Sequence, residues 1–204
     1  MNAAKLQLSK EELALASDPG WILTKNSIMG RAVDLMAVLS EGLGPGVSAL
    51  RQHLSGDDLP PNWATPKISK GENYQGLPYV VLDYPRLFGK EHILAIRTMF
   101  WWGHYFNVTL HLKGRYKDLF LPVIRQGVPD LAEAGFHAAI SGDEWRHELE
   151  SSHYRALKYE DIHPGKEYPF LKLSAKCPLD KWNDAPEILS GLNKMLIRVL
   201  TAGN

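Results

Sequence analysis

The chain has 204 residues, enough for one substantial domain that can stabilise its core without a metal ion or a disulfide. Its 23 basic and 23 acidic residues cancel, which argues against general binding to nucleic acids or anionic membranes. The single cysteine, Cys177, excludes an intrachain disulfide, and there is neither a signal-peptide pattern nor a stretch of 18 uncharged apolar residues. We therefore expect a soluble cytoplasmic protein.

Residues 1–55 have the pattern of short helices. Ser9 and Glu12 have the spacing of a capping box, and the run DPG at 18–20 predicts the end of that first helix. Apolar residues at helical spacing predict a second helix over about 24–40, which the run EGLGPG at 41–46 is expected to end. The residues that follow could form a further turn or two of helix.

Residues 56–78 carry four prolines and three glycines and are predicted to form a long connection. Connections of this length are uncommon inside compact domains and often carry function. Trp63, Ile68 and Tyr74 indicate that this one packs against the rest of the molecule.

Strand patterns dominate the next part of the chain. β-Branched and aromatic residues predict strands over 79–86, 92–102 and 105–114. The segment 115–135 is predicted to be helical, with a break near Gly127 and Pro129.

A second hairpin is predicted from 136–141 and 145–150, although the latter segment could also be helical. Residues 170–179 alternate clearly and predict a further strand. From Asp184 onward, apolar residues recur at helical spacing as far as Leu200, which predicts a long amphipathic helix.

Consecutive hairpins without regular strand–helix alternation indicate an α+β fold with a mainly antiparallel sheet. We expect the N-terminal helices and the C-terminal amphipathic helix to pack on one face of that sheet. The whole chain, 1–204, is expected to form a single domain: a helical part over 1–55, the connection over 56–78, and the sheet with its helices over 79–204.

The run RTMFWWGHYFNVTLHLK (97–113) predicts a β-hairpin whose loop length decides which side chains share a face. A two-residue loop, Gly103-His104, would place Arg97 among the apolar side chains of the second strand, and burying an unpaired charge costs several kcal/mol. A three-residue loop with Trp101 opposite Tyr105 keeps the charge out of the apolar layer. We therefore predict the three-residue loop.

The predicted register gathers polar and aromatic side chains on the second face of the sheet, where Asp83 could join them. The candidate ligand-binding residues are Asp83, Arg97, Trp101, Tyr105, Asn107 and His111. Aromatic surfaces with a few orienting polar groups are typical of small-molecule sites, and the arginine fork can hold a carboxylate or a phosphate. Alternatively, this face is an ordinary solvent-facing or oligomer-facing surface, with Arg97 paired to Asp83 or another carboxylate.

Other motifs give little support to catalysis. His137 and His147 have carboxylates nearby, but no HExxH pattern is present, so we expect no metal ion. Cys177 lies on the apolar side of its strand, and neither a Gly-x-Ser-x-Gly nor a Gly-x-Gly-x-x-Gly motif occurs. We expect no cofactor, and no motif identifies a family of known activity.

The sequence thus favours a ligand-binding or protein-interaction module that uses the polar-aromatic face, with a small anionic molecule as the expected ligand. Its six tryptophans make a homo-oligomer plausible. The alternative is an enzyme in which Arg97 orients a small anionic metabolite and His111 or Asp83 acts as acid or base. On the binding hypothesis, Arg97→Ala should abolish binding and leave the melting temperature almost unchanged.

Overall fold

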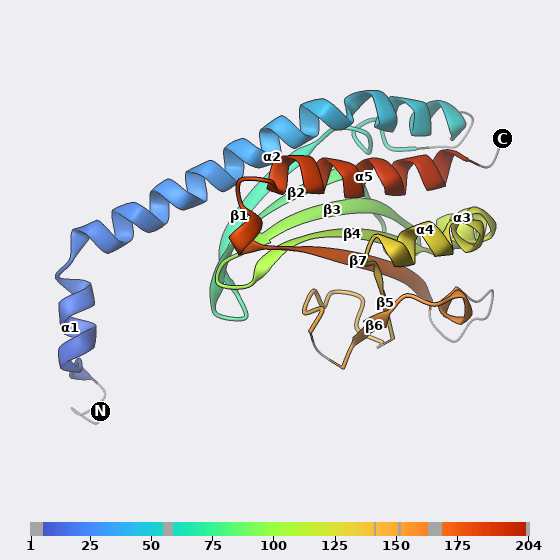
Figure 1. Ribbon diagram of the computed structural model, residues 1–204. Helices are drawn as coiled ribbons and strands as arrows, with labels where there is room; N and C mark the ends of the chain where they lie inside the picture. Colours follow the sequence, from blue (N-terminus) through green and yellow to red (C-terminus); the bar gives the residue numbers. More distant parts are fainter. Residues whose placement is uncertain (1–5, 55–58, 141, 151, 163–168, 203–204) are drawn as a thin grey trace.

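The computed structural model describes residues 6–54, 59–140, 142–150, 152–162 and 169–202. It shows the predicted α+β architecture: a seven-stranded sheet, antiparallel throughout, in the order β1-β2-β3-β4-β7-β5-β6. The helices α2, α3 and α5 lie on one face of this sheet (Figure 1). Most of the core is formed between these helices and the sheet.

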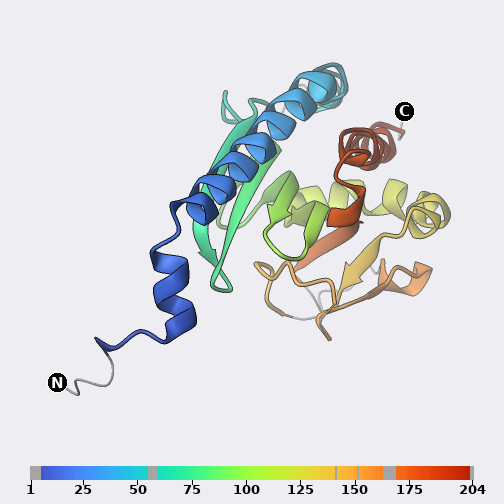
Figure 2. The ribbon, with the colours of Figure 1, turned by 60° about the vertical axis from the view of Figure 1, so that its left-hand side comes forward.

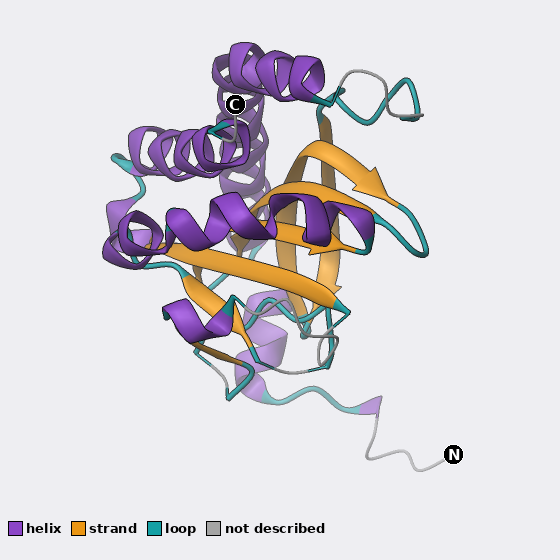
Figure 3. Cartoon of the chain, turned by 90° about the vertical axis from the view of Figure 1, so that its right-hand side faces the viewer, coloured by secondary structure: helices purple, strands orange, loops and turns teal. Residues whose placement is uncertain are grey.

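The strands are β1 (Lys67–Tyr74), β2 (Leu77–Phe88), β3 (Ile93–Trp101), β4 (Tyr105–Lys113), β5 (His137–Ala139), β6 (Tyr154–Ala156) and β7 (Phe170–Pro178). The helices are α1 (Lys10–Ala16), α2 (Pro19–His53), α3 (Arg115–Gln126), α4 (Val128–Glu133) and α5 (Ala185–Thr201). Two short 3-10 segments, η2 (Tyr159–Asp161) and η3 (Leu179–Lys181), complete the described elements. Figure 3 shows most of the helical segments on one side of the strands.

The register of the β3–β4 hairpin is the predicted one. Trp101 is opposite Tyr105, and the three loop residues include Gly103 at a φ of +75°. Phe100 and Phe106 are then opposite each other on the helix-covered face, whereas Arg97 lies on the second face. The cost of burying the charge was therefore a sufficient guide to this register.

The prediction that the N-terminal helix ends at EGLGPG is wrong, because α2 continues through this run to His53. Its buried positions recur at helical spacing along most of its length: Met29, Ala32, Met36, Leu39, Leu43, Val47 and Leu50. Gly46 lets α2 approach α5 closely, since a Cβ there would lie 3.1 Å from Ile197 Cγ2. Burial against α5 and β2 offsets the hydrogen bond that Pro45 removes.

Two other segments differ from the prediction. Residues 67–74, expected within a connection, form β1, an edge strand whose side chains are exposed or half-buried without regular alternation. Residues 145–150 do not pair with the described residues of 136–141; instead, β5 pairs with β6, where His137 is opposite Ala156. Side chains of the sheet form hydrogen bonds with the backbone of 145–150, as described below.

The C-terminal helix is confirmed with its apolar stripe, since Leu189, Leu192, Leu196 and Leu200 are buried. Asn193 is also buried among them, and its Nδ2 donates to Thr98 Oγ1 of β3 over 2.9 Å. One polar bond between helix and strand therefore lies inside the apolar layer.

Gly114, between β4 and α3, is expected to be the least replaceable of the positive-φ glycines. Its φ is +56°, and a Cβ there would overlap Glu91 O and the His92 imidazole. Gly103 also has a positive φ, but a Cβ there meets nothing within 4 Å. Gly114→Ala should lower the free energy of unfolding by roughly 3 kcal/mol or more, because strain and overlap add, whereas Gly103→Ala should lower it by about 1 kcal/mol. Urea denaturation of both variants tests this difference, and equal losses would contradict it.

Candidate functional site

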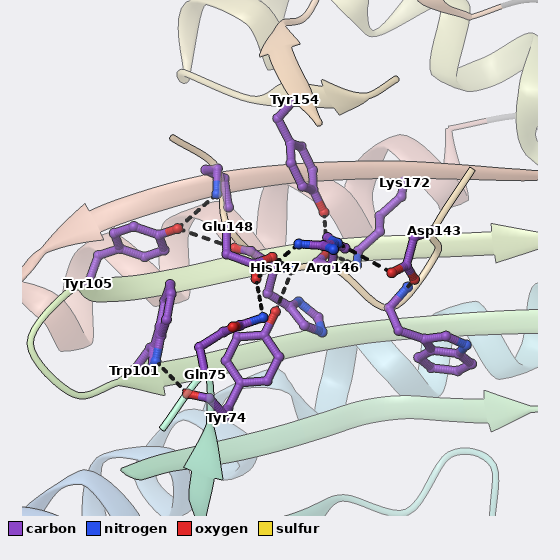
Figure 4. A network of polar contacts seen from close by, with 12 residues as sticks. Tyr74, Gln75, Trp101, Tyr105, Asp143, Arg146, His147, Glu148, Tyr154 and Lys172 are labelled. Carbon is purple, nitrogen blue, oxygen red and sulfur yellow. Dashed lines mark hydrogen bonds and ion pairs between the residues drawn. The ribbon is translucent and has the colours of Figure 1, made fainter. Parts of the chain in front are cut away.

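The second face of the sheet is partly covered by residues 143–149, a segment without regular structure that we call the strap (Figure 4). Tyrosine hydroxyls from the sheet form hydrogen bonds with the main chain of the strap. The Tyr105 hydroxyl accepts from Leu149 N over 2.8 Å and donates to His147 O over 3.2 Å. His147 N donates to the Tyr74 hydroxyl over 2.9 Å. Burial raises the pKa of Tyr105 to about 12 and raises that of Tyr74 as well, so both phenols stay neutral and can donate.

Lys172 of β7 anchors the middle of the strap. Its Nζ donates to Glu144 O over 2.9 Å and to Arg146 O, and the Tyr154 hydroxyl also donates to Arg146 O over 2.8 Å. Burial, and then the positive charge of Arg97, lower the pKa of Lys172 to about 7. Lys172 is thus an amine bonded to two main-chain carbonyls, and it can donate to both in either protonation state.

Arg97 and Asp83 form a two-pronged ion pair on neighbouring strands. Arg97 Nε lies 2.7 Å from Asp83 Oδ1, and Nη2 lies 3.0 Å from Oδ2. Asp83 is buried, and the Arg97 guanidinium also lies 5.5 Å from the centre of the Phe88 ring. The Arg97 guanidinium, which we expected to bind an anionic ligand, is therefore largely engaged by the Asp83 carboxylate of the protein itself.

His111 lies at the other end of the strap. Its Nε2 is 3.1 Å from Glu144 Oε2, and Lys113 Nζ donates to Glu144 Oε1 over 2.8 Å. Burial and the nearby charge of Lys172 lower the pKa of His111 to about 4, and Glu144 opposes this only in part. His111 is therefore neutral at physiological pH and does not form a charged pair with Glu144.

His147 is a buried residue of the strap. Burial, with the charges of Lys172 and Arg97, holds its pKa well below the usual range. Its Nε2 lies 3.4 Å from Arg97 Nη1, and its buried Nδ1 has no hydrogen-bond partner among the described residues. The cavity beneath the strap, which His147 lines together with His111 and Lys172, measures only about 10 Å³. That is room for about one water molecule, not for an organic ligand.

An open hollow of about 310 Å³ lies beside the strap, on the outer part of the same face. It is lined by Lys67, Ser69, Tyr79, Val81, Asp83, Arg86, Phe88 and Arg97. The pairing of the strands explains why these side chains meet: Lys67 is opposite Asp83, and Asp83 is opposite Arg97. Three cationic side chains and one carboxylate therefore surround the hollow.

A register shift in β2 adds the remaining wall. Up to Asp83 the odd-numbered residues of β2 face the hollow, and the pairing then slips between Asp83 and Arg86. Beyond the slip, Arg86 is opposite Ala95, so Arg86 and Phe88 lie on the same face as Arg97. Strict alternation along the sequence could not have placed them there.

The structure separates the predicted site residues into three groups. Asp83 and Arg97 line the open hollow. Trp101, Tyr105 and Asn107 are buried at the far end of β3 and β4, where Trp101 donates to Tyr74 O over 3.3 Å. His111 lines the small cavity under the strap.

Sequence reasoning did not include several residues that the structure brings to this face. Lys172 alternates with Leu171 and Leu173, so its place on the second face was visible, but nothing in the sequence showed that a strap covers it. Lys67 and Arg86 stood in a segment rich in polar residues, and only the pairing of β1 and the slip in β2 direct them to the hollow.

The structure gives His137 and His147 different surroundings. His137 Nδ1 lies 3.0 Å from Gly135 O, and His147 faces Arg97. The described part of the chain contains no group of three His, Cys, Asp or Glu side chains that could hold a metal ion.

A larger hollow, of about 570 Å³, lies between the β2–β3 turn and the start of α3. Its basic groups are Lys90 and His92 of the turn, Arg115 at the helix start, and Arg86, which lines both hollows. Arg115 N donates to His92 Nδ1 over 3.2 Å, so part of this wall is engaged in the turn itself. The smaller hollow is the better candidate because its charges stand on paired strands, which hold side chains more precisely than turns.

Comparisons with protein-family models, with curated proteins and with solved structures found no match to this chain.

Proposed function

We propose that the protein is a binding module for a small anionic ligand, which occupies the open hollow beside the strap. The observation that carries this proposal is the charge of its wall: Lys67, Arg86 and Arg97 against the single carboxylate of Asp83. Three cations and one anion leave two positive charges on a rigid sheet surface. An anion entering the hollow would compensate this excess.

Lys67 and Arg86 are the proposed anion contacts. Arg97 uses Nε and Nη2 for Asp83, so it contributes charge and little hydrogen bonding to a ligand. Arg86 donates through Nε to Thr65 O over 2.8 Å, which orients its guanidinium while the two terminal nitrogens stay outside that bond. Tyr79 and Phe88, the latter 41% exposed, offer flat surfaces to an apolar part of the ligand.

The enzyme hypothesis receives less support from the geometry. Asp83 lines the open hollow and His111 lines the 10 Å³ cavity under the strap, so the two proposed acid–base groups do not face a common space. Each is also engaged, Asp83 with Arg97 and His111 with Glu144. Binding without chemistry is therefore the function that we propose.

Phenyl phosphate is a suitable probe because it joins a dianionic group to one aromatic ring. We expect Lys67→Ala to weaken its binding by about tenfold, the loss of one charge-assisted contact. Lys70→Ala is the matched control, since Lys70 stands on the same strand but on the opposite face. Isothermal titration calorimetry measures both. Equal affinities of the two variants, or no binding by the wild type, would remove the proposal.

A further inference from the structure

The N-terminal arm, which we define as residues 9–27, projects away from the body of the protein (Figures 1 and 2). Helix α1 contains no buried residue, and the first nine residues of α2 are exposed apart from Lys25, which pairs with Glu72 of β1. Large apolar side chains on the arm are open to solvent: Leu13 is 57% exposed, Leu15 54% and Trp21 51%. A seven-residue helix gains too little by itself to be stable in water, so α1 requires a surface to pack on.

A groove of about 470 Å³ lies on the outer side of the molecule between α2 and α5. Its floor is apolar and shallow because α2 contributes Gly42, Pro45, Gly46 and Ala49, and α5 contributes Ile197. Lys194 and Arg198 of α5 add two positive charges to its wall, and neither forms an ion pair with another described residue. The groove therefore fits an apolar helix that carries a carboxylate.

The arm of the same chain cannot enter this groove. Only two residues, Ser17 and Asp18, join α1 to α2, and α2 runs without interruption from Pro19 past Gly42. At about 1.5 Å per residue, the groove begins roughly 35 Å along α2 from the point where α1 is attached. A second copy of the chain has no such restriction.

We propose that α1 of one protomer docks in the α2–α5 groove of a second copy, and that the exchange is reciprocal in a two-fold dimer. Glu11 and Leu15 are four residues apart and share one side of α1. In the groove, the carboxylate of Glu11 meets Lys194 and Arg198 while Leu15 packs on the small residues of α2. The reciprocal arrangement closes the assembly, as a two-fold interface requires.

The net charge of α1 favours docking in the groove over binding to a membrane surface. Helix α1 carries Lys10 against Glu11 and Glu12, a net charge of −1, which suits a basic groove and not an anionic lipid surface. Helix α2 does satisfy the length and composition of a membrane span, but a core helix satisfies them equally, and one face of α2 packs against α5 and β2.

Sedimentation velocity of the full chain is the first test. The wild type is expected to sediment as a dimer and Leu15→Glu as a monomer, because the new charge would be buried on the groove floor. Leu119→Glu is the matched control: this leucine of α3 is 49% exposed but lies outside the arm and the groove, so the dimer should persist. A monomeric wild type, or a dimer that survives Leu15→Glu, overturns the proposal.

Crosslinking identifies the surfaces that meet. A chain with Glu11→Cys is mixed with a chain with Lys194→Cys and oxidised; the native Cys177 is buried and does not compete. A disulfide between the two different chains is expected. A disulfide only between two Glu11→Cys chains, which means pairing of arm with arm, overturns the proposal.

Vesicle sedimentation tests the membrane alternative. A protein that stays monomeric and sediments with phosphatidylcholine–phosphatidylglycerol vesicles also overturns the proposal.

Discussion

Arg97→Ala is expected to lower the free energy of unfolding by about 3–5 kcal/mol, because it leaves the carboxylate of Asp83 unpaired. Asp83 is only 6% exposed and takes both of its short side-chain hydrogen bonds, 2.7 and 3.0 Å, from this arginine. This outcome replaces the expectation from sequence that the variant would melt almost normally. That expectation treated Arg97 as a free ligand-binding group, whereas the structure pairs it with the sheet itself.

The double variant Asp83→Leu/Arg97→Met separates loss of the pair from loss of packing. Replacing both ends of a buried ion pair with apolar side chains is often nearly neutral, so the double variant should be clearly more stable than Arg97→Ala alone. Guanidinium chloride denaturation of the wild type and both variants gives the comparison. If Arg97→Ala costs less than about 1 kcal/mol, the pair is weak, and Arg97 is freer for a ligand than its geometry indicates.

The main architecture was predictable because strong local patterns and global packing agree. The β3–β4 hairpin is an example: a single charge, Arg97, distinguished the two registers, since only one kept it out of the apolar layer. The apolar stripe of α5 similarly required a sheet to lie on. Where local and global preferences disagreed, the sequence misled. At Pro45 the local signal ends a helix, but burial of Leu43, Val47 and Leu50 continues it.

The site was predicted less well because it depends on a segment without periodicity. The strap has no pattern of its own, and its position follows from bonds to Tyr74, Tyr105 and Lys172, which lie far from it in the chain. Polar residues expected to face a ligand instead form hydrogen bonds with the main chain of the strap, because buried main-chain groups require hydrogen-bond partners. The slip in β2 that turns Arg86 into the hollow has no signal in the residue types around it.

Acid is expected to weaken the protein through His111. Its folded-state pKa is about 4, below the usual 6.5, so between these values the unfolded chain binds a proton that the folded chain does not. The stabilising contribution is complete above pH 6.5 and is lost as the pH falls toward 4. One pH unit between the two pKa values corresponds to about 1.4 kcal/mol, which makes the loss about 3 kcal/mol. His147, with a pKa lowered in the same direction, adds to it.

His111→Phe isolates this contribution. The imidazole lies between the rings of Trp145 and Phe170, with ring centres 5.6 and 5.8 Å away, so a phenyl ring keeps the packing and removes the titration. Urea denaturation at pH 6.5, 5.5 and 4.5 should show the wild type losing stability faster than the variant. Parallel curves would show that His111 is protonated in the folded state as readily as in the unfolded chain.

Lys172→Met tests why the pKa of His111 is low. Burial is the largest cause, and the positive charge of Lys172 is the second. Removing that charge should raise the pKa of His111 toward 6.5, which NMR titration of the imidazole measures directly, while the spectrum reports whether the variant is folded. An unchanged pKa would assign the effect to burial alone. A raised pKa would show that Lys172 and His111, which lie opposite each other on β7 and β4, are electrostatically coupled, so that protonation of one disfavours protonation of the other.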